Sequence, residues 1–317
     1  MSFAETVKDE ILSKPIKDEH CKIAFLSGLM RGTGVLYEKD EEIGLDFKVP
    51  NENCAFTVTM LLKSLFNYDV REVAVSENSL SKKDKFIISV SGKGSLNVLK
   101  SLGILTESNG ELSVNFHLYN EITKKDCCLR SFFRGLFVAT GNCTIPKNTK
   151  SKSSTGYHLE LSFSHSAPAQ ATSNKLAKCG IYPKIMRRKG NFILYLKSAE
   201  EIKDFIAFLS APVSVLKIID LMINRELSNT SNRQKNCDLG NLNRQIEAVA
   251  KQIEAISKIE KTIGLSSLKP ELKQVAVARR DYPDDSMTEL AHRLNLTKSC
   301  LNHRLRKIVN VADEVER

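Results

Sequence analysis

A nine-residue pattern occurs twice in this sequence and restricts its fold more than any other feature does. The first copy is LSGLMRGTG (26–34) and the second is FRGLFVATG (133–141), at an offset of 107 residues (133 − 26 = 107). In both copies Gly stands third, Leu fourth, Thr eighth and Gly ninth, and each copy follows an apolar helical run. Small residues along a helix allow a second helix to approach closely. The two copies therefore predict two helices packed on each other at a pseudo-twofold axis.

A second pair of segments repeats at nearly the same offset. The segments ISVSGKGSLNVLKSLG (88–103) and LYLKSAEEIKDFIAFL (194–209) each indicate a strand followed by a helix, at an offset of 106 residues (194 − 88 = 106). The apolar positions of the two helices correspond at helical spacing. They are Leu96, Leu99 and Leu102 in the first helix and Ile202, Phe205 and Phe208 in the second. Two repeats at almost one offset indicate a duplicated domain.

The hydrophobic pattern predicts the same order of elements in both halves. From each motif helix onward we expect α, β, β, α, β, β, α, with the first motif helix running from about Asp18 to Arg31. The segment Asn51–Phe66 is predicted to be a helix whose Phe56, Met60 and Leu61 face inward. Helices over one face of a small antiparallel sheet in each half make an α+β architecture.

The composition changes after the duplicated region. Residues 224–243 are rich in Asn, Ser, Arg and Gln. Apolar residues then recur at spacings of three and four, which predicts a connector helix from about Leu242 to Ile263, with a short coiled coil as the alternative. We expect a duplicated domain at 1–223 (halves about 1–120 and 121–223), a linker and connector helix at 224–265, and a small all-α domain at 266–317.

The overall composition limits the classes of function. The net charge of +10 over 317 residues favours an anionic partner, nucleic acid first. The sequence contains no apolar run long enough to span a bilayer and no export signal, so we expect a cytoplasmic protein. The eight Cys include no C-x-x-C pair, and only Cys127 and Cys128 are neighbours. We therefore expect reduced thiols, with no metal site and no cofactor.

The last domain carries the clearest binding signal. Ser286 and Glu289 have the spacing of a capping box that starts a helix, and Asn295 can adopt the left-handed conformation that ends it. Thr297 is a suitable N-cap for a second helix, predicted from Lys298 to Val309. This succession of helix, short turn and capped helix is the helix-turn-helix pattern.

The second helix of this pattern has one apolar and one basic face. Leu301, Leu305 and Ile308 form the expected buried stripe, and no acid occurs from Thr297 to Ile308. Basic residues on a short helix suit phosphate contact, while Asn and Arg can also read base edges. The alternative is a solvated face in a structural bundle. The predicted DNA contacts are Thr297, Lys298, Ser299, Asn302, His303, Arg304, Arg306 and Lys307.

Two further basic groups occur in the second half of the duplicated domain. They could supply auxiliary phosphate contacts, although the basic strand could equally be a solvated edge. One group lies in a polar loop and the other surrounds a strand. The residues are Lys147, Lys150 and Lys152 in the loop, and Lys184, Arg187, Arg188 and Lys189 around the strand.

The order of elements and the duplicated motif together resemble the LAGLIDADG homing endonuclease fold. In that family the two motif helices form the central interface, two saddle-shaped sheets lie on DNA, and the eighth motif residue is an acid that holds catalytic divalent metals. The resemblance does not extend to the acids, because the eighth positions are Thr33 and Thr140. It does extend to the small residues of the helix interface, which here are Gly28, Gly32, Gly135 and Ala139.

The loss of both acids argues against nuclease activity. A hydroxyl is a neutral ligand and cannot supply the charge that concentrates Mg²⁺ between helix ends. Arg31, close to Thr33, would oppose a cation further. The nearby carboxylates have no counterpart after Gly141; they are Glu38, Asp40 and Glu41.

Over its full length the sequence resembles the WhiA family of bacterial proteins, which is linked to sporulation transcription and cell division. Beyond the two motifs, the resemblance rests on NRQKNC (232–237), NLN (241–243) and NHRLRK (302–307). It implies a DNA-binding regulator with the helix-turn-helix as the principal DNA contact and the front domain as an auxiliary one. In some members the evident role is in division and chromosome segregation.

These observations predict a non-enzymatic bacterial regulator of transcription or cell division. Its expected partners are double-stranded DNA and other transcription or division proteins, and we expect a monomer associated with the nucleoid. Two alternatives stay open at this point. One is an active metal-dependent endonuclease, and the other is a protein-interaction module whose DNA binding is incidental.

Overall fold

The structure, a computed structural model, describes residues 1–39, 42–70, 73–76, 85–92, 94–115, 120–146 and 156–315. The chain divides into two compact units, Met1–Arg225 and Glu226–Arg317. The division falls inside one long helix, α8 (Pro212–Thr262). Among the described residues, no helix combines the length and the apolar character that crossing a membrane requires.

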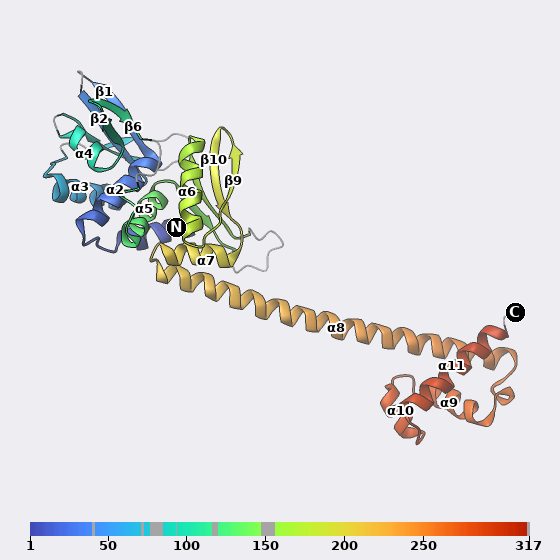
Figure 1. Cartoon of the computed structure of the whole chain (residues 1–317). Coiled ribbons are helices and arrows are strands. Elements are labelled where there is room, and N and C mark those ends of the chain that lie inside the picture. Colours follow the sequence, from blue (N-terminus) through green and yellow to red (C-terminus); the bar gives the residue numbers. More distant parts are fainter. Residues whose placement is uncertain are drawn as a thin grey trace. The chain divides into compact units, whose positions relative to one another are not determined.

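The two motif helices form the centre of the first unit. α2 (Glu19–Thr33) and α5 (Asp126–Thr140) pack against each other, as the duplicated pattern predicted (Figure 1). A Cβ added to Gly28 would overlap the carbonyl oxygen of Phe132, and one added to Gly135 would overlap that of Phe25. The two backbones are therefore in direct contact, which only glycine allows at these positions.

The second pair of small residues completes this contact. A Cβ on Gly32 would lie 2.5 Å from the Cβ of Ala139 and 2.9 Å from the Cγ2 of Thr140. Both distances are too short for real carbon atoms. All four small residues assigned to the helix interface thus lie in it.

Each half of the first unit carries a four-stranded antiparallel sheet with the same strand order. The first sheet has the order β1-β2-β4-β3 and the second has the order β7-β8-β10-β9. This identity of order confirms the duplicated α+β architecture. The strands are β1 (Gly34–Lys39), β2 (Glu42–Val49), β3 (Val73–Ser76), β4 (Lys85–Val90), β7 (Gly141–Thr144), β8 (His158–Phe163), β9 (Lys184–Arg188) and β10 (Asn191–Leu196).

Helices complete the core around these sheets. Each motif helix contacts the sheet of its own half, and further helices pack on the strands. The buried side chains of both halves form one continuous hydrophobic cluster. The remaining helices of this unit are α1 (Phe3–Leu12), α3 (Glu52–Phe66), α4 (Ser95–Ser101), α6 (Ser166–Lys178) and α7 (Ala199–Phe208).

The predicted inward face of α3 is partly wrong. Leu61 is buried, but Phe56 is 68% exposed and Met60 is 51% exposed. The face that enters the core instead contains Cys54, Val58 and Leu62. Because successive residues on a helix are about 100° apart, Phe56 lies on the side opposite Val58. The apolar residues surround this helix, and the packing of the sheet selects one side.

A short hairpin in the first half was missed by the sequence analysis. It consists of β5 (Leu105–Ser108) and β6 (Glu111–Val114). Asn109 and Gly110 join the strands with φ angles of +53° and +82°. An Asn-Gly pair between alternating strands is a strong hairpin signal, because both turn residues require positive φ. The signal was therefore present in the sequence.

The linker expected from residue 224 is helical. α8 continues through residues 224–241 without a break. This stretch contains no Pro, and its single Gly240 costs only about 1 kcal/mol in a helix interior. Pairs at helical spacing support it, such as Gln234 Nε2 donating to Asp238 Oδ1 at 3.0 Å. The polar composition therefore indicates exposure to water and not a loss of helix.

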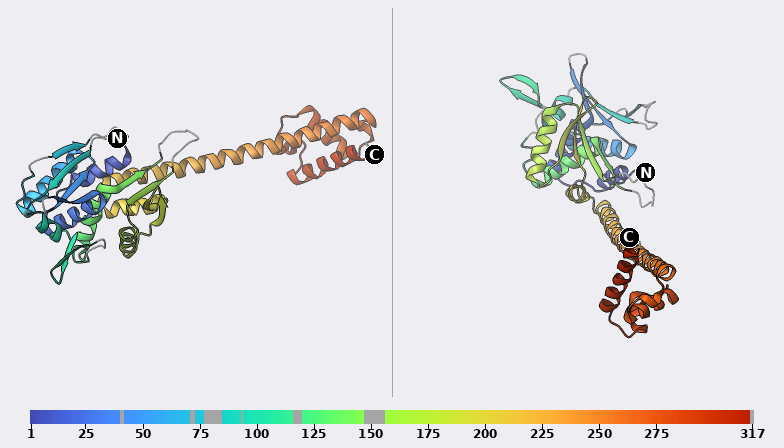
Figure 2. Two further views of the ribbon diagram at one scale, coloured as in Figure 1. Left: turned by 90° about the horizontal axis from the view of Figure 1, so that it is seen from above. Right: turned by 90° about the vertical axis from the view of Figure 1, so that its right-hand side faces the viewer.

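The second unit has a separate small core. α9 (Pro270–Asp281), α10 (Met287–Arg293) and α11 (Lys298–Glu314) lie beside the last turns of α8 (Figure 2). The single turn η1 (Leu265–Ser267) follows α8. Leu301, Leu305 and Ile308 are all buried, as predicted, together with Ile256 and Ile259 of α8.

The helix contact gives a direct test. We expect Gly28→Ala to destabilise the first unit by about 3 kcal/mol, because the added methyl group meets backbone that cannot move aside. Gly240→Ala is the matched control, since its Cβ would approach no described atom closer than the Nη2 of Arg244 at 3.9 Å. That change should stabilise α8 by up to about 1 kcal/mol. Urea unfolding followed by circular dichroism measures both, and equal midpoints would contradict the close contact.

Candidate nucleic-acid interface

The corner between α10 and α11 has the local geometry that the sequence predicted. The Ser286 N–H donates to Glu289 Oε2 at 2.8 Å, and the Glu289 N–H donates to Ser286 Oγ at 3.3 Å. Asn295 adopts a left-handed φ of +55°. Thr297 Oγ1 then caps α11 by accepting from the Cys300 N–H at 3.2 Å. Side chains therefore accept from one N–H group in the first turn of each helix, and the turn between the helices is closed by backbone bonds such as that from the Leu296 N–H to the Ala291 carbonyl oxygen at 2.8 Å.

The buried stripe of α11 determines which face remains outside. Leu301 and Leu305 are completely or almost completely buried, and Ala291 of α10 is 3% exposed where the two helices meet. A small side chain allows this close crossing. Burial of this stripe therefore fixes the orientation of α11, and the opposite face of the helix points to solvent.

The predicted DNA contacts lie on this outward face, with one exception. Seven of the eight residues are exposed: Thr297, Lys298, Ser299, Asn302, His303, Arg306 and Lys307. Within the described parts of the chain, no hydrogen bond or ion pair occupies the side chains of Asn302, His303, Arg306 or Lys307.

Arg304 has a different environment. Its side chain is 20% exposed, and its Nη2 lies 4.0 Å from the Oε2 of Glu271 on α9. The guanidinium is therefore directed toward its own domain. We assign Arg304 to the contact between α11 and α9, ahead of a contact with DNA.

A buried arginine supports the loop before α10, and the sequence analysis did not identify it. Arg279 Nη1 donates to the carbonyl oxygens of Asp285 at 2.7 Å and Pro283 at 3.3 Å. Its side chain is fully buried, and this burial lowers its pKa. An arginine in a helix lies on the solvent-exposed face far more often than on the buried one. Only the fold shows that Arg279 points inward.

The far ends of the motif helices carry no charge suited to a metal. Thr140 Oγ1 donates to the carbonyl oxygen of Leu136 at 3.1 Å, and Thr33 Oγ1 is buried without a hydrogen-bond partner. Glu38 is exposed. The other two carboxylates considered above, Asp40 and Glu41, lie outside the described residues. In the described ranges, His, Cys and carboxylate groups do not gather at this end closely enough to hold a metal ion.

The guanidinium of Arg31, near the C-terminal end of α2, donates to two backbone carbonyl groups. Its Nη2 donates to the carbonyl oxygen of Gly103 at 2.7 Å, and its Nη1 donates to that of Asn115 at 2.8 Å. Burial lowers the pKa of Arg31 to about 10, so it stays charged at neutral pH. The guanidinium therefore keeps its positive charge and is held by two carbonyl groups, two positions before Thr33 in α2. That this charge opposes a cation at Thr33 stays a prediction.

The basic strand of the second half is exposed but only partly free. Lys184, Arg187, Arg188 and Lys189 are all exposed on β9 and its turn. Arg188 Nη2 contacts both carboxylate oxygens of Glu160, at 3.0 and 2.9 Å. The Arg187 guanidinium lies 5.8 Å from the centre of the Phe192 ring. The loop residues Lys147, Lys150 and Lys152 lie outside the described residues.

Three family descriptions match the chain in sequence order. They are the WhiA N-terminal LAGLIDADG-like domain at residues 19–105, the WhiA LAGLIDADG-like domain at residues 129–228 and the WhiA C-terminal HTH domain at residues 231–312. The chain belongs to the WhiA family. The helix-turn-helix described above lies within the third match.

Full-length relatives agree with this membership. The chain is 34% identical over 321 residues to the probable cell division protein WhiA of Clostridium botulinum strain Hall, covering 100% of this chain and 99% of the relative. It is 32% identical to that of Caldicellulosiruptor saccharolyticus, covering 100% and 96%. The crystal structure of full-length WhiA from Thermatoga maritima matches with a TM-score of 0.61 and 25% identity, over 99% of each chain.

The role of Arg279 in holding the loop before α10 can be tested by substitution. Arg279→Met should destabilise the second unit by about 2 to 3 kcal/mol, because two carbonyl groups lose a charged donor. Arg280→Met is the matched control on the same helix, where the lost ion pairs with Glu260 and Asp281 are exposed and worth less than about 1 kcal/mol. Thermal melts of the full chain compare the two. Equal effects would show that Arg279 does not hold this loop.

Proposed function

We propose that this WhiA family member is a non-enzymatic DNA-binding regulator that contacts DNA chiefly through α11. The observation that carries the proposal is the outward face of α11. Its basic and amide side chains are exposed and available, while the opposite face anchors the helix in the core. A rigid helix with available donors is the arrangement that enters the major groove in helix-turn-helix proteins.

The positions along α11 suggest separate roles. Lys298, Asn302 and Arg306 follow one another at intervals of four residues and therefore share one face of the helix. Asn and Arg can form paired hydrogen bonds with adenine and guanine edges, so we assign Asn302 and Arg306 to base contact. Lys298 and Lys307 suit phosphates, and Ser299 and His303 lie on the neighbouring row.

The biological setting follows from the relatives. The curated relatives bear the name probable cell division protein. We infer that this chain is associated with the nucleoid and takes part in cell division. Its more specific proposed roles are the regulation of transcription and chromosome segregation. The exposed basic residues of β9 and of the turn after it are proposed as auxiliary phosphate contacts. Lys184, Arg187 and Lys189 are the stronger candidates, because Arg188 is already paired with Glu160.

The neutral helix ends support a non-enzymatic role. Thr33 and Thr140 offer hydroxyl groups where cleavage requires carboxylates, and Arg31 adds a positive charge two positions before Thr33 on α2. Together these groups disfavour the divalent cations that a nuclease of this fold needs.

The α11 assignment is tested on duplexes recovered by genome-wide mapping of the bound full-length protein. The Asn302→Ala and Arg306→Ala double variant should lose about 100-fold or more in site-specific affinity in a gel shift, because two base contacts are removed. Asn310→Ala is the matched control, since Asn310 is exposed two turns further along the same helix. Unchanged binding by the double variant would remove α11 from its role. Lys298→Ala should also reduce the salt slope by about 1.

The absence of nuclease activity has its own test. Supercoiled plasmid incubated with the full chain and Mg²⁺ or Mn²⁺ should stay supercoiled, because the helix ends supply no carboxylate. The same incubation with a chelator serves as the control. Cleavage at a specific site that the chelator abolishes would overturn the non-enzymatic proposal.

A further inference from the structure

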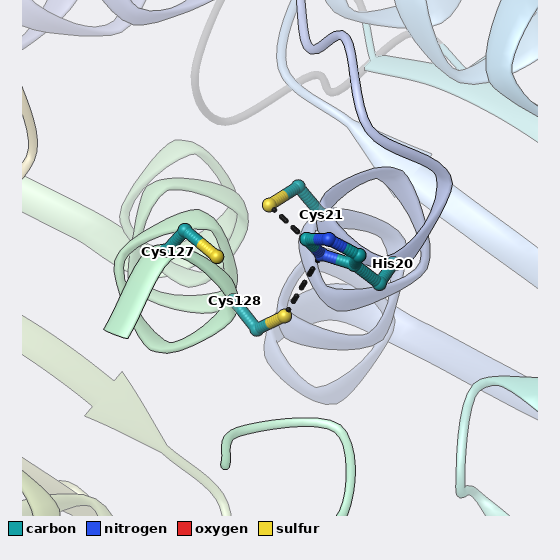
Figure 3. A group of neighbouring side chains, drawn as sticks. All are labelled: His20, Cys21, Cys127 and Cys128. Atoms are coloured by element: carbon teal, nitrogen blue, oxygen red, sulfur yellow. Dashed lines mark hydrogen bonds between the residues drawn. The ribbon is translucent and has the colours of Figure 1, made fainter. Parts of the chain in front are cut away.

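Four side chains with metal-binding atoms meet at the N-terminal ends of the two motif helices. His20 and Cys21 come from α2, and Cys127 and Cys128 come from α5 (Figure 3). One ligand atom from each residue lies within 4.8 Å of all the others. The Nδ1 of His20 is 3.3 Å from the Sγ of Cys21 and 3.2 Å from the Sγ of Cys128.

The cluster follows the duplication. The pair 127–128 is separated from the pair 20–21 by the same offset of 107 residues as the motif (127 − 20 = 107). Each pair occupies the second and third positions of its helix. The pseudo-twofold axis therefore brings two adjacent-residue pairs together. The sequence analysis expected no metal site because it considered only short spacings, and these ligands are paired across more than 100 residues.

Three thiols and one imidazole form a ligand set of known preference. Zn²⁺ is commonly held by three Cys and one His in a tetrahedron, at about 2.3 Å to sulfur and 2.1 Å to nitrogen. Neighbouring ligand atoms in such a tetrahedron are about 3.5 to 3.8 Å apart. The two nitrogen-to-sulfur distances are slightly shorter than this and every pair of ligand atoms lies within 4.8 Å, so small side-chain rotations would complete the geometry.

We propose that His20, Cys21, Cys127 and Cys128 bind one soft divalent cation, Zn²⁺ first, which joins the first turns of α2 and α5. The surroundings suit such a site. His20 and Cys127 are exposed and give the ion access from solvent, whereas Cys21 and Cys128 are buried and exclude water from one side. All four ligands come from rigid helices, and structural metal sites are usually closed in this way.

The protons and charges balance. On binding, three thiols release three protons, and Zn²⁺ with three thiolates and a neutral imidazole has a net charge of −1. Without a cation, burial raises the pKa of Cys21 to about 12 and also raises that of Cys128, so both thiols are neutral at pH 7. A coordinated thiol is deprotonated despite such a shift. Lys125 and Arg134 interact electrostatically with the sulfurs, and helix N-termini stabilise nearby negative charge.

The site is separate from the positions where nucleases of this fold hold their metals. Thr33 lies thirteen positions after His20 along α2 (33 − 20 = 13), a distance of about 20 Å at 1.5 Å per residue. An ion at the first turns would therefore act as a clamp on the α2–α5 contact and take no part in DNA cleavage. This inference does not depend on the proposed DNA-binding function.

Cobalt titration tests the proposal on the full chain. The protein is stripped with a chelator, kept reduced with a phosphine and titrated with Co²⁺. We expect saturation at one Co²⁺ per chain, with the thiolate-to-cobalt charge-transfer band and the intense visible bands of tetrahedral Co²⁺. One equivalent of Zn²⁺ should then abolish these bands. Weak octahedral bands without charge transfer would overturn the proposal.

Variants at the exposed ligands keep the test independent of folding. His20→Asn and Cys127→Ser should each weaken binding by more than about tenfold, because each removes a ligand without opening the core. Cys237→Ser is the matched control, since Cys237 is an exposed cysteine on α8 outside the cluster. Zn²⁺ should raise the melting temperature of the parent and of Cys237→Ser, but not that of Cys127→Ser. Equal binding by all three variants would overturn the proposal. So would a reduced protein that binds no metal and forms a Cys21–Cys128 disulfide on oxidation.

Discussion

The first unit depends on a backbone-to-backbone contact between two helices. At Gly28 and Gly135 each helix leaves just enough space for a carbonyl group of the other. Because no side chain separates the axes at these positions, α2 and α5 pack closely on each other. Each helix continues directly into the first strand of its own sheet, at Gly34 and Gly141. The position of both sheets therefore follows from this one contact.

The contact also gives the two ends of the helix pair different chemistry. At the C-terminal ends, the described residues include two threonine hydroxyls and the half-buried Arg31, and no cluster of His, Cys or carboxylate groups. At the N-terminal ends, three sulfurs and an imidazole converge. Hard cations prefer oxygen ligands and soft ones prefer thiolates. Among the described residues, the candidate metal ligands therefore gather at the N-terminal ends of the two central helices.

The second unit has its own core, and this explains how α11 can carry an exposed basic face. Leu301, Leu305 and Ile308 anchor the helix in the core that it shares with α9 and α10, while Asn302, His303, Arg306 and Lys307 stay exposed. Arg279 achieves the same rigidity for the loop before α10 through hydrogen bonds to two carbonyl groups. Substitution on the outer face can therefore change binding without changing the fold.

Local features could be predicted from the sequence because they depend on neighbouring residues. The capping box at Ser286, the left-handed Asn295, the buried stripe of α11 and the motif helices are all of this kind. The Asn109-Gly110 hairpin belongs with them, although it was overlooked. The tertiary structure alone decided the inward face of α3, the burial of Arg279 and the meeting of His20 with Cys128. These features depend on which surfaces approach each other across long stretches of chain, and neither periodicity nor local spacing carries that information.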